Sequence, residues 1–417
     1  MPNKKHTLET ILLLSMFAFA TFLASAPASA QTQTILHDFN GAGGVDGYNP
    51  VNTLIMDKSG NLYGTTTYGG TYSGVVDCCG TVFELSPNGS GGFTYKILYS
   101  FNPDNEDGNY PTPTVILDGD GNLYGTTSSG GAVDHGTVFE LSPQSGGTWK
   151  ETILYNFGRD GREPEAGLTM DPKGNLYGTT FMSSTGCECG TVFELTAKSG
   201  GAFSFRTIHT FTGYPDDGAA PNTPLTFRNG KLFGVTPFGG SYGAYDGTIF
   251  ELSPNGSGGW AESIIHSFGG PEDSDPTNGG IVFDSAGNLY GTTAGYAEAE
   301  LGSVYELSPS SGGSWTETIL YSFAGTDGAY PTNGPLVFGP KGNLYSTTLE
   351  GGANGEGVVY KLTPAGGTWT EKVLLSFDST NGLSPYGGVG LGNDRDLYGT
   401  TEYGGTYDAG VVYQIKP

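Results

Sequence analysis

Short apolar segments alternate with glycine-rich polar turns along almost the whole chain. The segment Gly-Asn-Leu-Tyr-Gly-Thr-Thr stands at residues 60–66, 121–127, 174–180 and 287–293. Looser copies extend its Leu-Tyr or Leu-Phe pair to Leu62, Leu123, Leu176, Leu232, Leu289, Leu344 and Leu397. The pair recurs every 53 to 61 residues. A repeat of this length, built from short β-like segments, is typical of a propeller or a repeat array.

Each repeat contains four apolar segments of about five residues, which is the usual length of a strand. In the first repeat they occupy residues 53–57, 62–66, 81–85 and 97–101. Asp-x-x-Gly-Asn separates the first two segments, and Ser-Pro followed by glycines separates the last two. Both are turn sequences. Four antiparallel strands of this kind make one propeller blade.

The two ends of this repeat array complement each other. The chain opens with a fourth segment, residues 35–39, that has no repeat before it, and it closes with a third segment, residues 411–415. Pairing of these segments would close the ring and remove an open sheet edge. The sequence therefore predicts an all-β, seven-bladed β-propeller of four-stranded antiparallel blades, in which the N-terminal strand completes the last blade.

The first thirty residues have a different pattern. Lys4 and Lys5 precede an apolar stretch at residues 11–20, and Ala28-Ser29-Ala30 precedes Gln31. A basic start, a short apolar region and small residues before the cleavage point indicate a secretory signal peptide. We expect residues 1–30 to be removed after Ala30. Residues 31–417 would then form a single propeller domain that is secreted, periplasmic or on the cell surface.

Composition limits the partners of this domain. The formal net charge of −25 argues against nucleic acid and anionic membranes, because both require a basic face. No stretch after the signal peptide is apolar enough to cross a bilayer. The chain has 72 glycines, but its 23 phenylalanines and 25 tyrosines can build a core. We expect a monomer that binds a carbohydrate or protein ligand.

The repeated motifs Gly-Asn-Leu-Tyr-Gly-Thr-Thr and Gly-Thr-Val-Phe-Glu-Leu-Ser-Pro resemble those of the GloVer-type tandem-repeat family of exported bacterial proteins. The resemblance covers essentially all of the chain after residue 30. It implies a bacterial source and a secreted or surface location. It carries no catalytic residues to this sequence.

Comparison among the repeats separates structural residues from candidates for function. His37, His209 and His266 share one position of the fourth segment with tyrosines of other repeats, so we interpret them as structural. The glutamates that recur in the third segment are structural for the same reason. His135 alone has no repeat equivalent, and one loop histidine does not make an acid–base apparatus. We expect no catalytic residues.

The loops between the second and third segments vary most, and they should emerge on the same face as the connections between blades. Ring closure makes the first and seventh repeats neighbours, and both carry tyrosines in this loop. Aromatic faces with carboxylates suit sugars or peptides. The candidate ligand-binding residues are Tyr68, Tyr72, Tyr403, Tyr407, Asp46 and Asp77. The alternative is that these loops only pack on one another.

Acidic residues also recur in the connections between repeats. Asp-Gly before proline is a good turn, so structure explains most of them. Together they would still give one rim a negative charge, and Ca²⁺ is the cofactor that suits such a rim, although no EF-hand spacing is present. The connections include Asp46, Asp104, Asp107, Asp160, Asp216, Asp217, Glu272, Asp275 and Asp327.

Four cysteines stand in two close pairs, Cys78-Cys79 and Cys187-Glu188-Cys189. Each pair precedes the Gly-Thr of a third segment, in the first and third repeats. A link from one pair to the other is disfavoured because a whole repeat separates them. In an oxidising compartment we expect local disulfides within each pair. The alternative is a metal site formed by these thiols with His135.

The sequence leaves two functions open. The first is an exported, non-enzymatic binding or surface-display propeller that recognises carbohydrate or peptide through an aromatic and acidic loop face. The alternative is a calcium-dependent propeller enzyme of the lactonase or polysaccharide lyase type. That enzyme needs several carboxylate and amide ligands and a base at the axial channel. The side chains that line the channel therefore discriminate between the two.

Overall fold

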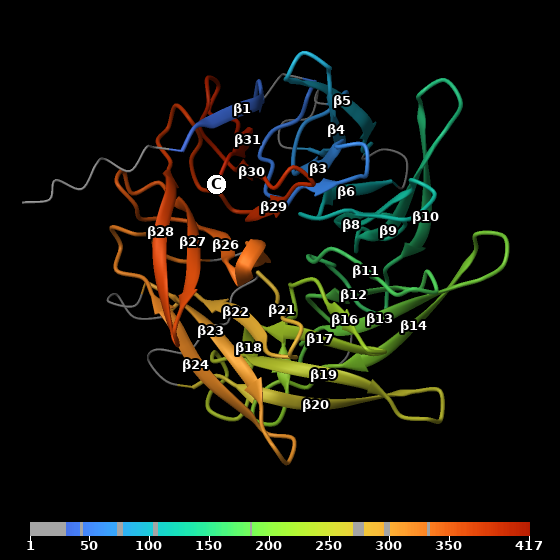
Figure 1. Cartoon of the computed structure of the whole chain (residues 1–417). Coiled ribbons are helices and arrows are strands. Elements are labelled where there is room, and N and C mark those ends of the chain that lie inside the picture. The colour runs from blue at the N-terminus through green and yellow to red at the C-terminus, as the bar shows by residue number, and fades with distance from the viewer. Residues whose placement is uncertain are drawn as a thin grey trace, which may run out of the picture. The chain divides into compact units, whose positions relative to one another are not determined.

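In the part of the chain that the computed structural model describes, each repeat folds into an antiparallel sheet, and seven such sheets form a β-propeller (Figure 1). The described residues are 31–41, 45–72, 78–102, 107–183, 186–269, 279–295, 301–331 and 334–417. Residues Gln31–Pro417 form one compact unit. The predicted signal peptide lies outside the described residues. The predicted fold, all-β with seven blades, is confirmed.

The strands of a blade follow one another outward from the axis. Blade one consists of β2 (Ile55–Met56), β3 (Leu62–Thr66), β4 (Thr81–Pro87) and β5 (Phe93–Ser100). Blade two consists of β7 (Ile116–Leu117), β8 (Leu123–Gly130), β9 (Thr137–Pro143) and β10 (Trp149–Asn156), and β6 (Gly108–Pro111) also pairs with β8. Blade three consists of β11 (Thr169–Met170), β12 (Leu176–Thr180), β13 (Thr191–Ala197) and β14 (Phe203–Thr210).

The second half of the ring repeats this order. Blade four consists of β16 (Thr226–Arg228), β17 (Lys231–Thr236), β19 (Thr248–Pro254) and β20 (Trp260–Ser267), with a short pair, β15 (Gly218–Ala219) and β18 (Phe238–Gly239), beside it. Blade five consists of β21 (Val282–Phe283), β22 (Leu289–Thr293), β23 (Ser303–Pro309) and β24 (Trp315–Ser322). Blade six consists of β25 (Val337–Phe338), β26 (Leu344–Thr348), β27 (Val358–Ala365) and β28 (Thr368–Ser376), with a 3-10 turn, Pro340–Gly342, between β25 and β26.

The last blade is completed by the N-terminal strand. It consists of β29 (Val389–Leu391), β30 (Leu397–Thr401), β31 (Val411–Ile415) and β1 (Gln33–Asp38). In Figure 1 the blue β1 lies beside the red β31. The strands are antiparallel, with Gln33 opposite Ile415 and Asp38 opposite Val411. The predicted closure of the ring is confirmed.

The turn before each second strand explains the first half of the repeated heptapeptide. In blade one, Asp57 Oδ1 accepts hydrogen bonds from the amides of Ser59 and Asn61. Asp57 Oδ2 accepts from the side chains of Asn61, at 2.8 Å, and Tyr63, at 3.2 Å. This Asx turn reverses the chain and fixes the tyrosine of the second strand. The Asn-Leu-Tyr element is therefore structural.

Close packing explains the glycines that flank the second and third strands. Gly64 lies opposite Phe83, and a Cβ at Gly64 would stand 2.6 Å from the phenylalanine ring. Gly80 precedes the third strand, and a Cβ there would stand 2.5 Å from Pro111 of the next blade. The first glycine makes room for a core aromatic ring, and the second allows two blades to approach.

Candidate functional site

The blades present two different faces. The loop face carries the loops between second and third strands, such as residues 67–80, and the connections between blades. The turn face carries the turns between first and second strands, such as residues 57–61. The amide of Tyr110, in a connection, donates to the carbonyl of Cys79, in a loop, at 3.1 Å. Loops and connections therefore lie together, as the sequence predicts.

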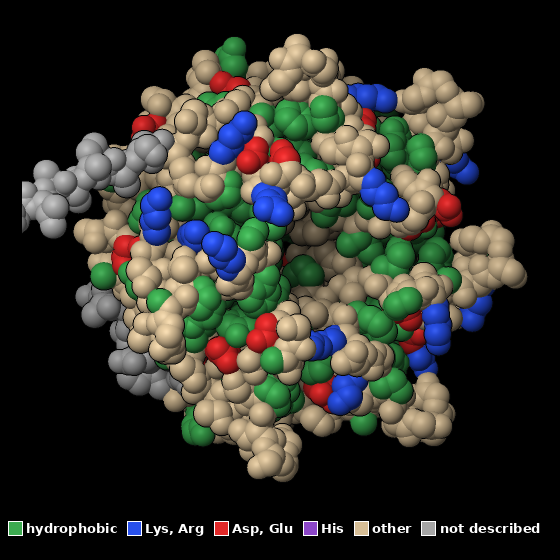
Figure 2. All heavy atoms as spheres, viewed as in Figure 1, with side chains coloured by type: hydrophobic (Ala, Val, Ile, Leu, Met, Phe, Trp, Pro, Cys, Tyr) green, Lys and Arg blue, Asp and Glu red, His purple; other side chains and the backbone are tan. Residues whose placement is uncertain are grey.

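The turn face carries exposed cations beside its aspartates. Exposed cations stand in its turns, at Lys58, Lys173, Lys341 and Arg395. The aspartates of the same turns accept hydrogen bonds from the turn itself, as Asp57 does. Figure 2 shows Lys and Arg side chains around a hollow at the centre of one face. The acidic excess of the chain therefore falls mainly on the loop face.

A cavity of about 290 Å³ occupies the axis, and every blade contributes to its wall. Prolines, glycines and aliphatic side chains form most of this wall. Its polar side chains include Glu165, Asn222 and Tyr386. Asn222 Oδ1 is buried and makes no hydrogen bond within the described residues. This oxygen can therefore accept a hydrogen bond from a group that enters the channel.

Electrostatics in the channel depend on Glu165, the carboxylate among its described lining residues. The side chain keeps contact with solvent, yet burial and the nearby charge of Glu163 raise its pKa to about 6. Burial, with the charges of Glu402 and Glu165, raises the pKa of Tyr386 as well.

The loop face carries most of the exposed aromatic surface. Among the described residues, the large apolar side chains that are exposed lie on this face, except for Ile35 in β1. Exposed aromatic rings that retain a polar group are a common feature of recognition surfaces. The exposed tyrosines are Tyr72, Tyr214, Tyr242, Tyr245, Tyr403 and Tyr407.

The four tyrosines singled out by the sequence form an inner and an outer pair. Tyr68 stacks on Tyr48 with ring centroids 5.3 Å apart, and the proximity of Tyr68 contributes to a raised pKa of Tyr403. The main cause of that raised pKa is the hydrogen bond of Tyr403 to Glu402. Tyr68 and Tyr403, the inner pair, lie in loops of the neighbouring blades one and seven.

Tyr72 and Tyr407, the outer pair, lie near the ends of fourth strands. The amide of Thr71 donates to Ser100 Oγ at 3.3 Å, and the amide of Thr406 donates to Asp38 Oδ2 at 3.1 Å. The two rings are 47% and 60% exposed. Because they are so exposed, their removal should affect binding more than folding.

Asp46, the fifth candidate, lies between two blades. Its side chain is buried, and its Oδ2 lies 3.1 Å from His37 Nε2, in a hydrogen bond between the last blade and the first. The hydroxyl of Tyr95 donates a hydrogen bond to the backbone carbonyl of Asp46. The sixth candidate, Asp77, lies outside the described residues. The structure thus assigns Asp46 a place between blades, which the sequence did not indicate.

The position of Asp46 recurs at other junctions between blades. We call each junction a seam; it comprises a fourth strand, the connection after it and the fourth strand of the next blade. An aspartate of the connection contacts a His or Tyr on the fourth strand that precedes it. In several seams it also lies near a Glu on the fourth strand of the next blade. In the seam between blades one and two, Tyr99 donates to Asp107 at 2.8 Å and to Glu151 at 3.3 Å. The predicted acidic rim is therefore partly turned inward; its members Asp104, Glu272 and Asp275 lie outside the described residues.

The seam glutamates are residues that the sequence analysis missed. A signal was present, because each stands two residues after the tryptophan that opens its strand. The repeat at this position was hidden by Gln33, Tyr95 and Phe205, which replace the acid in three blades. The seam glutamates are Glu151, Glu262, Glu317 and Glu371.

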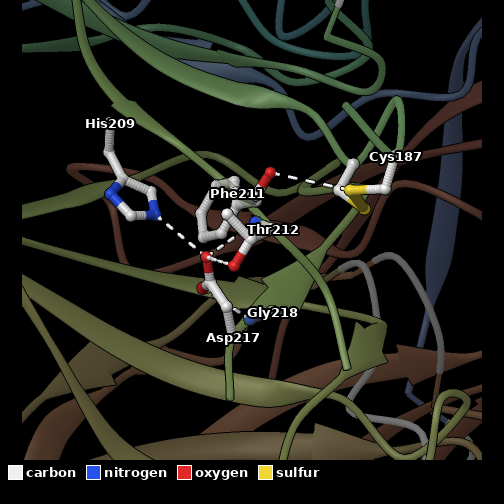
Figure 3. The surroundings of a disulfide bond; sticks show 7 residues. Cys187, His209, Phe211, Thr212, Asp217 and Gly218 are labelled. Atoms are coloured by element: carbon white, nitrogen blue, oxygen red, sulfur yellow. Dashed lines mark hydrogen bonds and ion pairs between the residues drawn. A yellow bond between two sulfur atoms is a disulfide. The ribbon is translucent and has the colours of Figure 1, made fainter. Parts of the chain in front are cut away.

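Three potential metal ligands meet in the seam between blades three and four. His209 Nε2 lies 3.5 Å from Asp217 Oδ2 (Figure 3), and 3.4 Å from Glu262 Oε1. Burial and the charge of Asp217 raise the pKa of Glu262 to about 7, although the charge of His209 opposes this. Burial also acts to raise the pKa of Asp217, but His209 and the Thr212 amide outweigh it and lower that pKa.

A disulfide stands beside each of two seams. The structure joins Cys78 to Cys79, both buried, near the seam of Tyr99. It joins Cys187 to Cys189 near the seam of His209, where Cys187 Sγ lies 3.7 Å from the carbonyl of Phe211 (Figure 3). Each disulfide therefore braces the loop against which the following connection packs.

Three overlapping stretches of the sequence, residues 20–186, 68–269 and 229–417, match the Gloeobacter/Verrucomicrobia repeat. The chain belongs to this repeat family. The matches overlap because each spans several blades, so the family repeat is carried by the blades described above. No curated protein matches the sequence. Among the described residues of this repeat-family protein, none forms a helix long and apolar enough for a membrane span.

Solved structures resemble the repeat-family propeller in fold alone. One is an ulvan lyase of polysaccharide lyase family 25, bound to a GlcA-Rha3S unit. Its TM-score is 0.53 at 11% identity, and the match covers 92% of this chain and 95% of the lyase chain. A putative glucose dehydrogenase from Thermus thermophilus has a TM-score of 0.42 at 16% identity, over 72% and 95% of the two chains. A protein of unknown function from Dyadobacter fermentans has a TM-score of 0.40 at 12% identity, over 92% and 98%.

Proposed function

We propose that this protein is an exported, non-enzymatic binding propeller that recognises a carbohydrate or a peptide through its loop face. The observation that carries the proposal is the concentration of exposed tyrosines on that face. Each ring offers a stacking surface and a hydroxyl, and stacking is worth on the order of 1 kcal/mol per ring. Export rests on the signal-peptide pattern of residues 1–30.

Charge narrows the class of ligand. Loops and connections of the loop face carry many more carboxylates than cations; Arg159 is exposed there, and the exposed cations Lys58, Lys173, Lys341 and Arg395 stand on the turn face. An acidic surface repels anionic polymers such as uronate-rich or sulfated polysaccharides. The proposed ligand is therefore a neutral glycan or a neutral to basic peptide.

The channel supports binding over catalysis. A calcium-dependent lactonase or lyase would need several oxygen ligands and a base that converge on the axis. Glu165 is the carboxylate among the described lining residues, and most of its neighbours are proline, glycine or aliphatic. The solvent-exposed tyrosine rim offers more ligand contacts than this wall does.

The test is a glycan array and a peptide array probed with the mature protein, with and without Ca²⁺. We expect a neutral or basic ligand whose affinity falls about tenfold or more in the double variant Tyr72→Ala/Tyr407→Ala, because two stacking contacts are lost. The melting temperature should stay nearly unchanged, since both rings are largely exposed.

The double variant Tyr242→Ala/Tyr245→Ala is a matched control on the same face in blade four. It should leave affinity unchanged if the site lies at the junction of blades one and seven. Catalytic turnover of the ligand, or a ligand whose affinity is insensitive to both double variants, would contradict the proposal.

A further inference from the structure

The seam between blades three and four brings together three donor atoms of the kinds that bind transition metals. These are His209 Nε2 and one carboxylate oxygen each from Asp217 and Glu262, and all lie within 4.8 Å of one another. The histidine comes from β14, the aspartate from the following connection and the glutamate from β20. Ring packing alone brings these three elements together.

The spacing of the donors suits a bound ion better than direct hydrogen bonds. A tetrahedral ion with ligands at about 2.1 Å places them about 3.4 Å apart. The two distances from His209 Nε2 are 3.5 Å and 3.4 Å. His209 Nε2 and Glu262 Oε1 are buried, and the contacts described for them are these two long ion pairs. Buried polar atoms usually have a closer partner.

The aspartate is held in place by groups outside the donor set. Asp217 Oδ1 accepts a hydrogen bond from the amide of Gly218 at 2.6 Å, and Oδ2 accepts from the amide of Thr212 at 2.7 Å (Figure 3). Such contacts orient a ligating carboxylate before the metal arrives. The side chains of His209, Asp217 and Glu262 are 18%, 8% and 15% exposed, so solvent reaches the group.

The seam between blades one and two shows what the histidine changes. It has the same aspartate and glutamate, but Tyr99 replaces the histidine, and its hydroxyl donates to Asp107 at 2.8 Å and to Glu151 at 3.3 Å. The phenol bridges both carboxylates without any ion. The histidine seam has a nitrogen donor at this position instead.

We propose that His209, Asp217 and Glu262 bind a divalent transition metal ion of the zinc class, with water in the remaining coordination position. One imidazole and two carboxylates suit Zn²⁺ and, more weakly, Mn²⁺. The imidazole disfavours Ca²⁺, which prefers six or more oxygen ligands. The site lies in a seam and is independent of the tyrosine rim, so it stands whether or not the loop face binds a glycan or peptide.

The test is zinc binding by the untagged, disulfide-bonded mature protein, measured by isothermal titration calorimetry and by metal content after dialysis. We expect His209→Tyr and Glu262→Gln each to remove one equivalent of zinc or to weaken it at least about 100-fold. Millimolar Ca²⁺ should not compete. Zinc should raise the melting temperature of the wild type more than that of either variant.

His37→Tyr is the matched control, because His37 faces Asp46 but has Tyr95 in place of a second carboxylate. Tyrosine stands at the equivalent position in other seams, so both His→Tyr variants should fold. The control should bind as much zinc as the wild type. Equal zinc binding by the wild type, His209→Tyr and Glu262→Gln would overturn the proposal, as would an absence of zinc binding by the wild type.

Discussion

The seam between blades one and two and the seam between blades three and four have the same plan and different chemistry. Each has a disulfide beside it, an aspartate in its connection and a glutamate on the next blade. In the first seam, the Tyr99 hydroxyl donates hydrogen bonds to both carboxylates. In the second, His209 faces both at distances that leave room for an ion. One side chain thus decides whether a seam is closed by hydrogen bonds or open to a ligand.

The comparison also shows why identical blades are not functionally equivalent. Strand pairing and the Gly-Pro contacts between blades repeat around the ring, so they hold the two seams in the same geometry. A change of residue type within that geometry alters only the local chemistry. Changes to the shared framework should therefore lower stability more than changes of residue type within a seam.

The largest effect should come from removing the strand that closes the ring. Deleting residues 31–40 removes β1, the buried Phe39 and the seam contact of His37 with Asp46. We expect loss of cooperative thermal unfolding, measured by calorimetry, because β31 becomes an open edge. Shortening the exposed turn at residues 144–147 is the control and should shift the melting temperature by only a few degrees. Equal shifts would mean that closure is not essential.

The second largest effect should come from removing a seam aspartate. Asp107 accepts hydrogen bonds from Tyr99 and from the amides of Asn102 and Gly108, at 2.7 to 2.9 Å. Asp107→Ala removes a buried acceptor from all three donors, of which Tyr99 keeps Glu151, and we expect about 3 kcal/mol lower stability in urea denaturation. Asp107→Asn keeps part of the network and should lose less. Asp217→Ala should behave similarly, and an effect below about 0.5 kcal/mol at either site would contradict this structural role.

A third effect should appear in the pH dependence of stability. Burial and the neighbouring Asp107 raise the pKa of Glu151 to about 8, from an ordinary value of 4.5. The folded state therefore holds this proton more tightly than the unfolded state. The stabilisation it gives is complete below about pH 4.5 and is lost as the pH rises to about 8.

Glu151→Gln should reduce this loss, because glutamine does not titrate. Calorimetry between pH 5 and pH 9 should show a smaller fall in melting temperature for the variant than for the wild type. A residual slope is expected, since burial raises the pKa of Glu371 to about 7. Parallel profiles for the wild type and Glu151→Gln would show that Glu151 is ionised in the folded protein at neutral pH.

These seams mark the limit of what the sequence could predict. The blade number and the ring closure followed from counting segments, because every blade repeats its own turns and strands. The shared position of His37, His209 and the tyrosines was also visible, and its structural interpretation agrees with their place between blades. Their partners were not visible, since a seam joins residues about fifty positions apart and only blade packing brings them together.

The candidate binding residues divide in the same way. Ring closure, which the sequence predicted, makes the blades of Tyr68 and Tyr403 neighbours, and their shared role in binding stays a prediction. Asp46 was expected beside the tyrosines because ring closure brings its connection to blades one and seven, and the structure buries its side chain between these two blades. The direction of a side chain at a junction depends on the neighbouring blade, and a repeat pattern contains no information about that.

The two disulfides should differ in how readily they are reduced, with little effect on stability. Cys78 and Cys79 are buried, whereas Cys187 is exposed. With mild reductant and an alkylating agent, the native protein should be modified first at Cys187 and Cys189, as mass spectrometry of peptides would show. The unreduced protein should show no thiol and no link between the two pairs. Such a link would contradict the local pairing, and faster modification of Cys78 would contradict its burial.

The smallest change in stability, and the sharpest test of the comparison, should come from converting one seam into the other. Tyr99→His places an imidazole beside Asp107 and Glu151, which is the arrangement of His209, Asp217 and Glu262. Without metal we expect a stability change below about 1 kcal/mol, because histidine already stands at this position in other seams. With zinc the variant should bind one equivalent more than the wild type, measured by calorimetry.

Tyr155→His is the control, because Phe205 replaces the seam glutamate there and only Asp160 remains as a carboxylate partner. A gain of zinc in both variants would mean that one aspartate is enough. A gain in neither would mean that the residue at this position does not decide between a closed seam and a metal site.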